Sequence, residues 1–205
     1  MPLVQLLLAQ AQRCGLLSND LDDQSGATPE LVFSLVRDMP YQRASSRNPE
    51  DIIGEWRGTC SGKHYLLRDL FEELWFKTRI LMCPHFFTPQ NTAHFPVSLR
   101  RQTLAGSIPD IHTFLRIEIA EEWIDVDATW PLKAGSLGFP VNQDLRPGVN
   151  MEIACQPIEI LEIPEGMEPQ SFKEQLIAAH CHGRQDQRDR FIEDMSGWLS
   201  EITPR

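Results

Sequence analysis

The stretch that decides the fold is residues 58–64, Gly-Thr-Cys-Ser-Gly-Lys-His, because a long helical pattern starts there. From Cys60 onward apolar residues recur at helical spacing, and the polar residues mostly fall on the opposite side. Gly58 breaks any preceding helix, so the pattern predicts a helix from Cys60 to Trp75 with Cys60 in its first turn. Its apolar positions are Tyr65, Leu66, Leu67, Leu70, Phe71, Leu74 and Trp75.

A cysteine in the first turn of a helix can act as a nucleophile. Unpaired backbone N–H groups and the helix dipole stabilise an anion there, which lowers the thiol pKa. The same N–H groups can hold an oxyanion during acyl transfer. A free cysteine is also often a small buried residue, so Cys60 alone leaves both interpretations open.

Two alternating segments farther along the chain predict a hairpin. Residues 112–119 form its first strand, with His112 at the start, and residues 123–127 form the second after a tight turn at 120–122. This pairing returns Asp127 beside residues 112–114, so that its carboxylate can reach the imidazole. Asp125 shares the face of Asp127 and is the alternative, but it lies farther from His112. Taken alone, His112 is equally compatible with a structural role at a sheet edge, and Asp127 with a structural role in a turn.

If Cys60, His112 and Asp127 meet in space, they form a thiol nucleophile, its base and the carboxylate that orients the base. Their order and spacing resemble the transglutaminase-like superfamily, which has a Gly-x-Cys at a helix start, a His at a strand start and an Asp-x-Thr closing the next strand. The segment is similar to small bacterial members with a Gly-Thr-Cys-Ser-x-Lys-His signature and an upstream Pro-Tyr-x-Arg, here residues 40–43. The resemblance covers about residues 28–130. His112 is followed by Thr-Phe, where the family often has Ala-Trp or Cys-Trp.

The resemblance implies an α+β fold with a papain-like core, in which an antiparallel sheet packs against the nucleophile helix and extra helices lie at both termini. One domain would span residues 1–205, with a catalytic core at about 28–165 and C-terminal helices at about 168–202. It also implies a thioester on Cys60 and acyl transfer to an amine or water, without a cofactor or metal. The substrate would be a small molecule, a peptide or an acyl group on a carrier protein. A cysteine peptidase or amidase, and a non-catalytic binding module, are the alternatives.

Several further residues are candidates for substrate binding. Lys63 and His64 belong to the Cys60 motif itself, and Tyr41, Arg43, Trp56 and Trp130 lie before or after the segments that hold Cys60, His112 and Asp127. The planar guanidinium of Arg43 can clamp a carboxylate or phosphate, and Lys63 can bind an anionic group. Packing or solvation is the alternative role for each of them. In particular, a packed His64 and tryptophans in the core are the simpler interpretations.

Composition limits the class of protein. The 205 residues carry a net charge of −10, with 41% hydrophobic and 23% charged residues, as expected for a globular protein. This charge argues against nucleic acid or an anionic membrane surface as a partner. The N-terminus has no basic segment of the kind that starts a signal peptide, and the five cysteines show no disulfide-framework spacing, so we expect reduced thiols and a cytoplasmic location.

Metal sites are weakly indicated. The triplet His180-Cys181-His182 lacks the paired ligand spacing of a zinc site, although a metal-dependent hydrolase using both histidines is a rival hypothesis. The acidic residues of 18–26 lack the glutamate of a calcium loop and predict a solvated loop. The remaining pattern predicts helices at 2–14, 28–38, 49–56, 168–179 and 185–202, strands at 78–87 and within 150–163, and irregular stretches at 88–109 and 131–147.

Overall fold

The fold is α+β, as the sequence predicts. The computed structural model describes residues 1–18 and 27–202, so the predicted loop at 18–26 lies, from residue 19 on, outside the described residues. The helices are α1 (Leu3–Arg13), α2 (Pro29–Arg37), α3 (Pro49–Glu55), α4 (Cys60–Glu73), α5 (Val97–Ala105), α6 (Pro169–Cys181), α7 (Gln185–Ile202) and the 3₁₀ helix η1 (Leu132–Leu137). The strands are β1 (Thr78–Phe87), β2 (Ile108–Ile119), β3 (Glu122–Val126) and β4 (Leu161–Glu162).

The strands form a four-stranded antiparallel sheet in the order β3-β2-β1-β4. A long pairing of β1 with β2 makes its centre, and Cys83 lies directly opposite His112 in this pairing. β2 and β3 are joined by Ala120 and Glu121, which both have positive φ values of 52° and 67°. Positive φ at both central residues is typical of the two-residue turns that match the twist of a hairpin.

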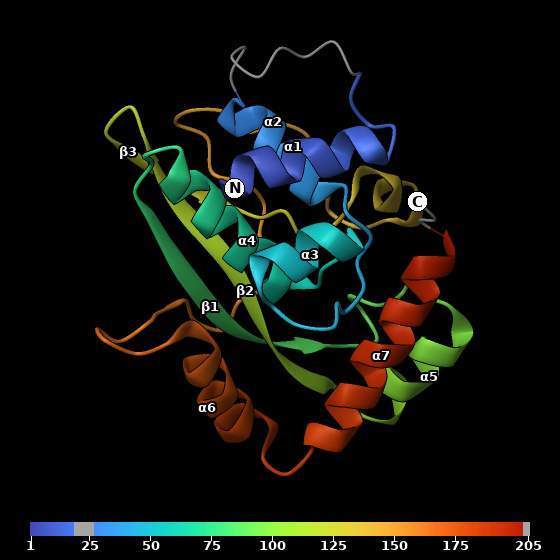
Figure 1. Cartoon of the computed structure of the whole chain (residues 1–205). Coiled ribbons are helices and arrows are strands. Elements are labelled where there is room, and N and C mark those ends of the chain that lie inside the picture. Colours follow the sequence, from blue (N-terminus) through green and yellow to red (C-terminus); the bar gives the residue numbers. More distant parts are fainter. Residues whose placement is uncertain (19–26, 203–205) are drawn as a thin grey trace.

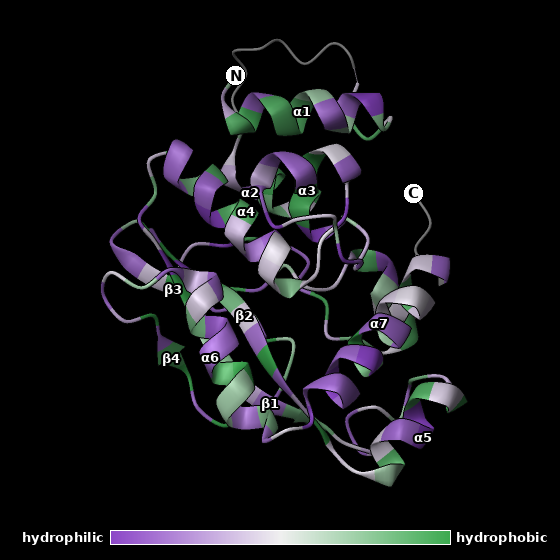
Figure 2. Ribbon diagram, turned by 60° about the horizontal axis from the view of Figure 1, so that its bottom comes forward, coloured by the Kyte–Doolittle hydropathy of each residue, from purple (hydrophilic) through white to green (hydrophobic). Residues whose placement is uncertain are grey.

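Helices α4 and α6 pack against β1 and β2, and α1, α2 and α3 cover α4 (Figure 1). The buried side of α4 supplies Leu66, Leu67, Leu70 and Phe71, which are fully inaccessible to solvent and belong to the main core. Figure 2 shows the outer layer formed by α1, whose apolar residues Val4 and Leu7 extend the same core. Helix α4, which begins at Cys60, is therefore held between the sheet and a layer of N-terminal helices.

A second core cluster lies away from α4, where α5 and α7 meet the segment that follows β3. Aromatic side chains dominate it, and its large members are Tyr41, Phe95, Trp130, Phe139 and Phe191. In Figure 1 α7 runs beside α5, on the side of the molecule away from α1 and α2. The C-terminal helices are thus built into the fold, because α6 packs on the sheet and α7 closes this second cluster.

The structure corrects four sequence predictions. Helix α4 ends at Glu73 and Trp75 is 95% exposed with a φ of 67°, so Trp75 terminates the helix instead of extending its apolar face. The predicted irregular stretch 88–109 contains α5, and β2 begins at Ile108, which places His112 inside the strand. Of the predicted strand region 150–163, only the two residues of β4 pair with the sheet.

No helix within residues 1–18 and 27–202 has both the length and the apolar character that a membrane span requires.

We expect Phe71→Ala to lower the free energy of unfolding by about 4 kcal/mol, because it removes a fully buried ring and leaves a cavity. Trp75→Ala is the matched control from the exposed end of the same helix, and it should change stability by less than about 0.5 kcal/mol. Urea denaturation followed by circular dichroism measures both. Equal effects of the two substitutions would contradict this description of the core.

Candidate active site

Cys60 is the first residue of α4, and its side chain is buried. Within the described part of the chain, the Thr59 side chain makes no capping hydrogen bond to the helix. The backbone N–H groups of the first turn are therefore not used by a cap, and they remain available to an anion on or next to the sulfur. The glycine before this turn is also constrained, since a Cβ at Gly58 would lie 3.1 Å from the Lys63 side chain.

His112 and Asp127 are joined by a hydrogen bond of 2.7 Å between Nε2 and Oδ2. The register of β2 and β3 explains this contact. Val126 pairs with Leu115, so Asp127 is a diagonal neighbour of His112 just beyond the end of β3. Because Nε2 is occupied by the carboxylate, Nδ1 is the imidazole nitrogen that remains for Cys60. The imidazole and the thiol interact closely enough to shift each other's pKa, that of the thiol downward and that of the imidazole upward.

Asp127 is held by two backbone donors in addition to His112. The N–H of Thr129 donates to Oδ1 at 3.0 Å, and the N–H of Ala154 donates to Oδ2 at 2.8 Å. Burial favours the neutral carboxyl, but the charge and hydrogen bond of His112, followed by lesser contributions that include Thr129, hold the pKa of Asp127 well below its usual range. The buried aspartate is thus anionic and fixed in position.

The three side chains favour a thiolate and an imidazolium over two neutral groups. Burial opposes both charges. For Cys60, the charge of Lys173 and then the hydrogen bond and charge of His112 outweigh burial and lower the thiol pKa to about 6. For His112, the charge and hydrogen bond of Asp127 and then the contacts with Cys60 outweigh burial and raise the pKa well above its ordinary value. A thiolate is therefore the dominant form at neutral pH.

Lys173 of α6 is a further residue of the candidate site, and it is not among the residues that the sequence predicts there. Its side chain is buried, and Nζ lies 3.6 Å from the Cys60 sulfur, 2.7 Å from Ser61 Oγ and 3.0 Å from Thr113 Oγ1. A sequence signal existed, because Lys173 lies three and four residues before Leu176 and Ile177 and so falls on the apolar face of the predicted helix. A lysine at such a position requires polar partners, and Cys60, Ser61 and Thr113 provide them.

The buried side chains of His64 and Lys63 connect backbone segments around the site through hydrogen bonds. His64 Nδ1–H donates to the Cys60 carbonyl at 2.7 Å, and Nε2 accepts the N–H of Ala128 at 2.9 Å. Burial lowers the pKa of His64 to about 4, so the ring is neutral and links the first turn of α4 to the residue after Asp127. Lys63 Nζ donates to the carbonyls of Arg37 at 2.8 Å and Thr129 at 3.1 Å. Both side chains are fully buried and neither lines the cavity at Cys60.

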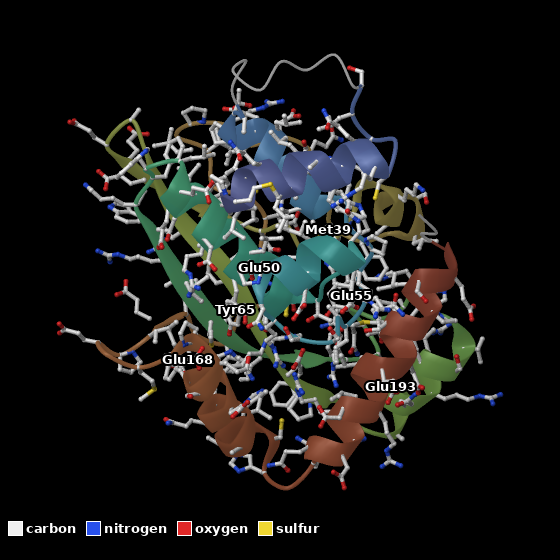
Figure 3. All side chains as sticks on the ribbon, in the orientation of Figure 1. Met39, Glu50, Glu55, Tyr65, Glu168 and Glu193 are labelled. Atoms are coloured by element: carbon white, nitrogen blue, oxygen red, sulfur yellow. The ribbon has the colours of Figure 1, made fainter. Side chains whose placement is uncertain are left out.

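A small cavity of about 50 Å³ opens at Cys60 between α4, α6 and α7. Figure 3 shows Tyr65 of α4 and Glu168, the residue before α6, on the side where these two helices approach each other. Of the predicted substrate-binding residues, Tyr41 and Arg43 line this cavity. Residues that the sequence analysis did not single out complete the lining: Arg47, Thr59, Ser61, Asp110, Gln170, Lys173, Ile177, Arg188 and Ile192.

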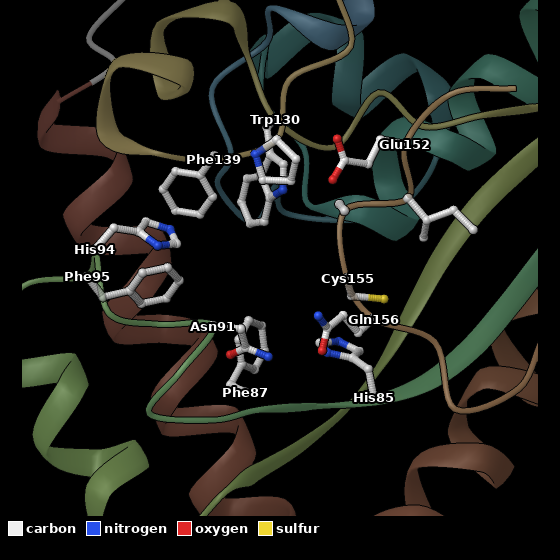
Figure 4. Close-up of a pocket in the computed structure, with 13 residues that line it drawn as sticks. His85, Phe87, Asn91, His94, Phe95, Trp130, Phe139, Glu152, Cys155 and Gln156 are labelled. Atoms are coloured by element: carbon white, nitrogen blue, oxygen red, sulfur yellow. The ribbon is translucent and has the colours of Figure 1, made fainter. Parts of the chain in front are cut away.

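Trp56 and Trp130 lie elsewhere. Trp56 is buried in the main core at the end of α3, with a left-handed backbone. Trp130 contacts Tyr41, with ring centroids 4.8 Å apart, but it lines a second cavity of about 150 Å³ (Figure 4). Around that cavity Figure 4 shows Phe95 and Phe139 on one side and His85 and Cys155 on the other. His85 and Ala154 connect its wall to the active site, since they contact Asp110 and Asp127.

Asp110 and Arg188 form a buried ion pair in the wall of the Cys60 cavity. Arg188 donates to Asp110 Oδ1 through Nε and Nη2, both at 2.6 Å, and His85 lies 3.6 Å from Oδ2. Burial favours the neutral acid, but the charge of Arg188 and the contacts with His85 keep the pKa of Asp110 well below its usual range. This pair fastens α7 to β2. No local pattern in the sequence predicts this ion pair, because Asp110 and Arg188 are far apart in the chain.

The rival residues have other contacts. Asp125, the alternative to Asp127, accepts a hydrogen bond from Arg116 at 2.7 Å. His180 Nε2 donates to the His85 carbonyl at 3.0 Å, and His182 caps the C-terminus of α6 in a left-handed conformation. Among the residues that the structure describes, no group of three or more His, Cys, Asp or Glu side chains is arranged to hold a metal ion.

We expect Lys173→Met to raise the pKa of Cys60 from about 6 toward the ordinary thiol value of about 8.5, because it removes the strongest charge that favours the thiolate. The pH dependence of Cys60 alkylation by iodoacetamide, resolved by peptide mass spectrometry, measures this change. Lys77→Met, which alters an exposed lysine, should leave the value unchanged. A pKa that stays near 6 in folded Lys173→Met protein would exclude this role.

Removing one partner of the buried ion pair should be costly. We expect Arg188→Met to lower the free energy of unfolding by about 3–5 kcal/mol, because it leaves the Asp110 carboxylate buried without its guanidinium. Adding Asp110→Asn to that variant should restore part of the loss, whereas Arg190→Met on the exposed face of α7 should have little effect. Thermal and urea unfolding measure all three; an unchanged stability of Arg188→Met would contradict the assignment.

No protein-family model matches this chain, and neither a curated protein nor a solved structure does. The geometry around Cys60 therefore carries the functional argument by itself.

Proposed function

We propose that this protein is a cysteine acyltransferase or amide hydrolase, in which Cys60 forms a thioester with the acyl group of its substrate. The single observation that carries the proposal is a set of buried groups around one thiol: Lys173 Nζ lies 3.6 Å from the Cys60 sulfur, the imidazole of His112 interacts with the same thiol, and Asp127 is hydrogen bonded to that imidazole. Thiols whose pKa is lowered by neighbouring cations are typical of reactive cysteines, and strongly shifted pKa values cluster at functional sites. Cys60, His112 and Asp127 match the roles of nucleophile, base and orienting carboxylate.

The first half-reaction follows from these positions. The Cys60 thiolate attacks the carbonyl carbon, forming an S–C bond and placing a negative charge on the carbonyl oxygen. The first-turn N–H groups of α4 are placed to stabilise that charge. As the intermediate collapses, the bond from the carbonyl carbon to the leaving group breaks, and the leaving group takes a proton from Nδ1 of the His112 imidazolium. The products of this step are a thioester on Cys60 and a neutral imidazole.

The second half-reaction reverses these proton movements. An amine or a water molecule gives a proton to His112 Nδ1 and attacks the thioester carbonyl. The S–C bond then breaks, which regenerates the thiolate beside the imidazolium. Asp127 keeps Nε2 protonated throughout, so that Nδ1 always faces the reaction.

An α+β fold with a four-stranded antiparallel sheet does not by itself identify a papain-like core, so we propose the transglutaminase-like class from the sequence motifs and from the layout of the site. Supporting features are the nucleophile at the start of a helix, the histidine on an adjacent strand and the aspartate after the next strand of an antiparallel sheet. The cavity of about 50 Å³ favours a small acyl group over an extended peptide, because little space surrounds the sulfur. Acyl transfer or hydrolysis on a small molecule or carrier-bound acyl group is therefore preferred to endopeptidase activity.

An activated ester tests the proposal without knowledge of the natural substrate. With p-nitrophenyl acetate, we expect a burst of one p-nitrophenolate per protein and an acetyl adduct on Cys60 detected by mass spectrometry. Cys60→Ala should abolish the burst, and His112→Gln should slow it by about 100-fold or more. Cys83→Ser, which removes another buried thiol, is the matched control and should retain the burst.

Hydroxylamine or a primary amine should accelerate turnover of the adduct if the acyl group is passed to amines, and water alone should clear it if the protein is a hydrolase. A wild-type protein that shows no adduct on Cys60, or an adduct that forms equally well without His112, would leave a binding module as the better description.

A further inference from the structure

Two arginines lie at the rim of the Cys60 cavity. Arg43 and Arg47 both line it, and both side chains are exposed. Neither guanidinium has a carboxylate partner among the described residues, whereas Arg188 deeper in the same wall is paired with Asp110 and Asp189. The two rim arginines thus have no internal ion pair to neutralise them.

The charge of this cavity is opposite to that of the whole chain. Four cationic side chains line it, and Asp110 is its only carboxylate among the described residues. The chain as a whole carries a net charge of −10. A cationic opening in an acidic protein concentrates field lines at the opening and attracts anionic molecules to it. Two of the four cations, Lys173 and Arg188, are buried and already bonded inside, so Arg43 and Arg47 are the ones that face an incoming molecule.

The size of the cavity fixes how such a molecule would lie. About 50 Å³ beside the Cys60 sulfur admits only the end of a substrate that carries the reacting carbonyl. The remainder must stay at the opening, where the guanidinium groups of Arg43 and Arg47 are located. Guanidinium groups bind carboxylate and phosphate through paired hydrogen bonds.

We propose that Arg43 and Arg47 bind an anionic group, a carboxylate or a phosphate, on the acyl donor while its carbonyl end enters the cavity at Cys60. This inference rests on the proposed function and names its substrate class: an anionic acyl donor. Arg43 and Arg47 select the substrate and take no part in the bond changes at Cys60.

Two alkylating reagents of similar size test this selection. Iodoacetate and iodoacetamide both transfer a methylene carbon to the Cys60 sulfur with loss of iodide, but only iodoacetate is anionic. The ratio of their rates at Cys60 cancels changes in thiol reactivity and reports the preference for an anion. At low ionic strength we expect Arg43→Gln and Arg47→Gln each to lower this ratio about threefold, and the double variant to lower it further.

Arg100→Gln is the matched control, because Arg100 is an exposed arginine on α5 that does not line the cavity. Its ratio should equal that of the wild type. A variant that combines Arg43→Lys with Arg47→Lys should retain much of the wild-type ratio, since it keeps both charges. Added salt should lower the wild-type ratio toward that of the double variant. A ratio that is the same in the wild type and the double variant would overturn the proposal.

The failure of this inference is distinguishable from failure of the proposed function. A Cys60 thiol of ordinary pKa, measured with iodoacetamide alone, would contradict the proposed function whatever the ratio shows. Inorganic phosphate and acetate, each compared with chloride at equal ionic strength, identify the anion. Slower alkylation of wild-type Cys60 by iodoacetamide in phosphate assigns a phosphate-bearing donor, and slower alkylation in acetate assigns a carboxylate. Protection that persists in the double variant would contradict binding at Arg43 and Arg47.

Discussion

The hydrogen bond between His112 and Asp127 is the contact on which the rest of the site depends. It requires a hairpin of fixed register, because a shift of one residue would move the carboxylate to the other face of the strand. It also requires the backbone donors of Thr129 and Ala154, which keep a buried carboxylate charged. With that charge in place, His112 accepts a proton, and the thiol of Cys60 can lose one. A buried thiolate and imidazolium are stable only together, so sheet, helix and loop are constrained by one electrostatic arrangement.

Elements far from the three catalytic candidates complete the arrangement. Lys173 of α6 places a buried cation beside the Cys60 sulfur, and Arg188 of α7 pairs with Asp110 in the cavity wall. The C-terminal helices are therefore part of the site as well as of the fold. His64 has a complementary role, since its neutral ring bridges the Cys60 carbonyl and the Ala128 amide and so holds the start of α4 next to the segment that follows Asp127.

The periodicity of short sequence segments predicted the elements whose positions depend on neighbouring residues in the chain. Helical periodicity gave the start of α4 at Cys60, and alternation gave the β2–β3 hairpin that brings Asp127 to His112. The predicted end of α4 at Trp75 was wrong, because this residue has the spacing of an apolar helix position but is left in solvent by the tertiary packing. Helix α5 was not predicted, because the prolines and polar residues around it are typical of a loop. Arg188 and Asp110 reach the site only through long-range packing, which no spacing in one sequence reveals. Lys173 stands out in the sequence by its position on an apolar helix face, but only the folded chain shows that its partners are Cys60, Ser61 and Thr113.

The most direct measurement is the titration of the His112 ring by NMR in the wild type and in Cys60→Ala. The account predicts that His112 is protonated at pH 7 in the wild type, with a pKa well above the ordinary value of about 6.5. It also predicts that the pKa falls when Cys60 is replaced, because the thiolate is one of the groups that stabilise the imidazolium. A His112 ring that is neutral at pH 7 in the wild type, or that titrates identically without Cys60, would contradict the thiolate–imidazolium pair.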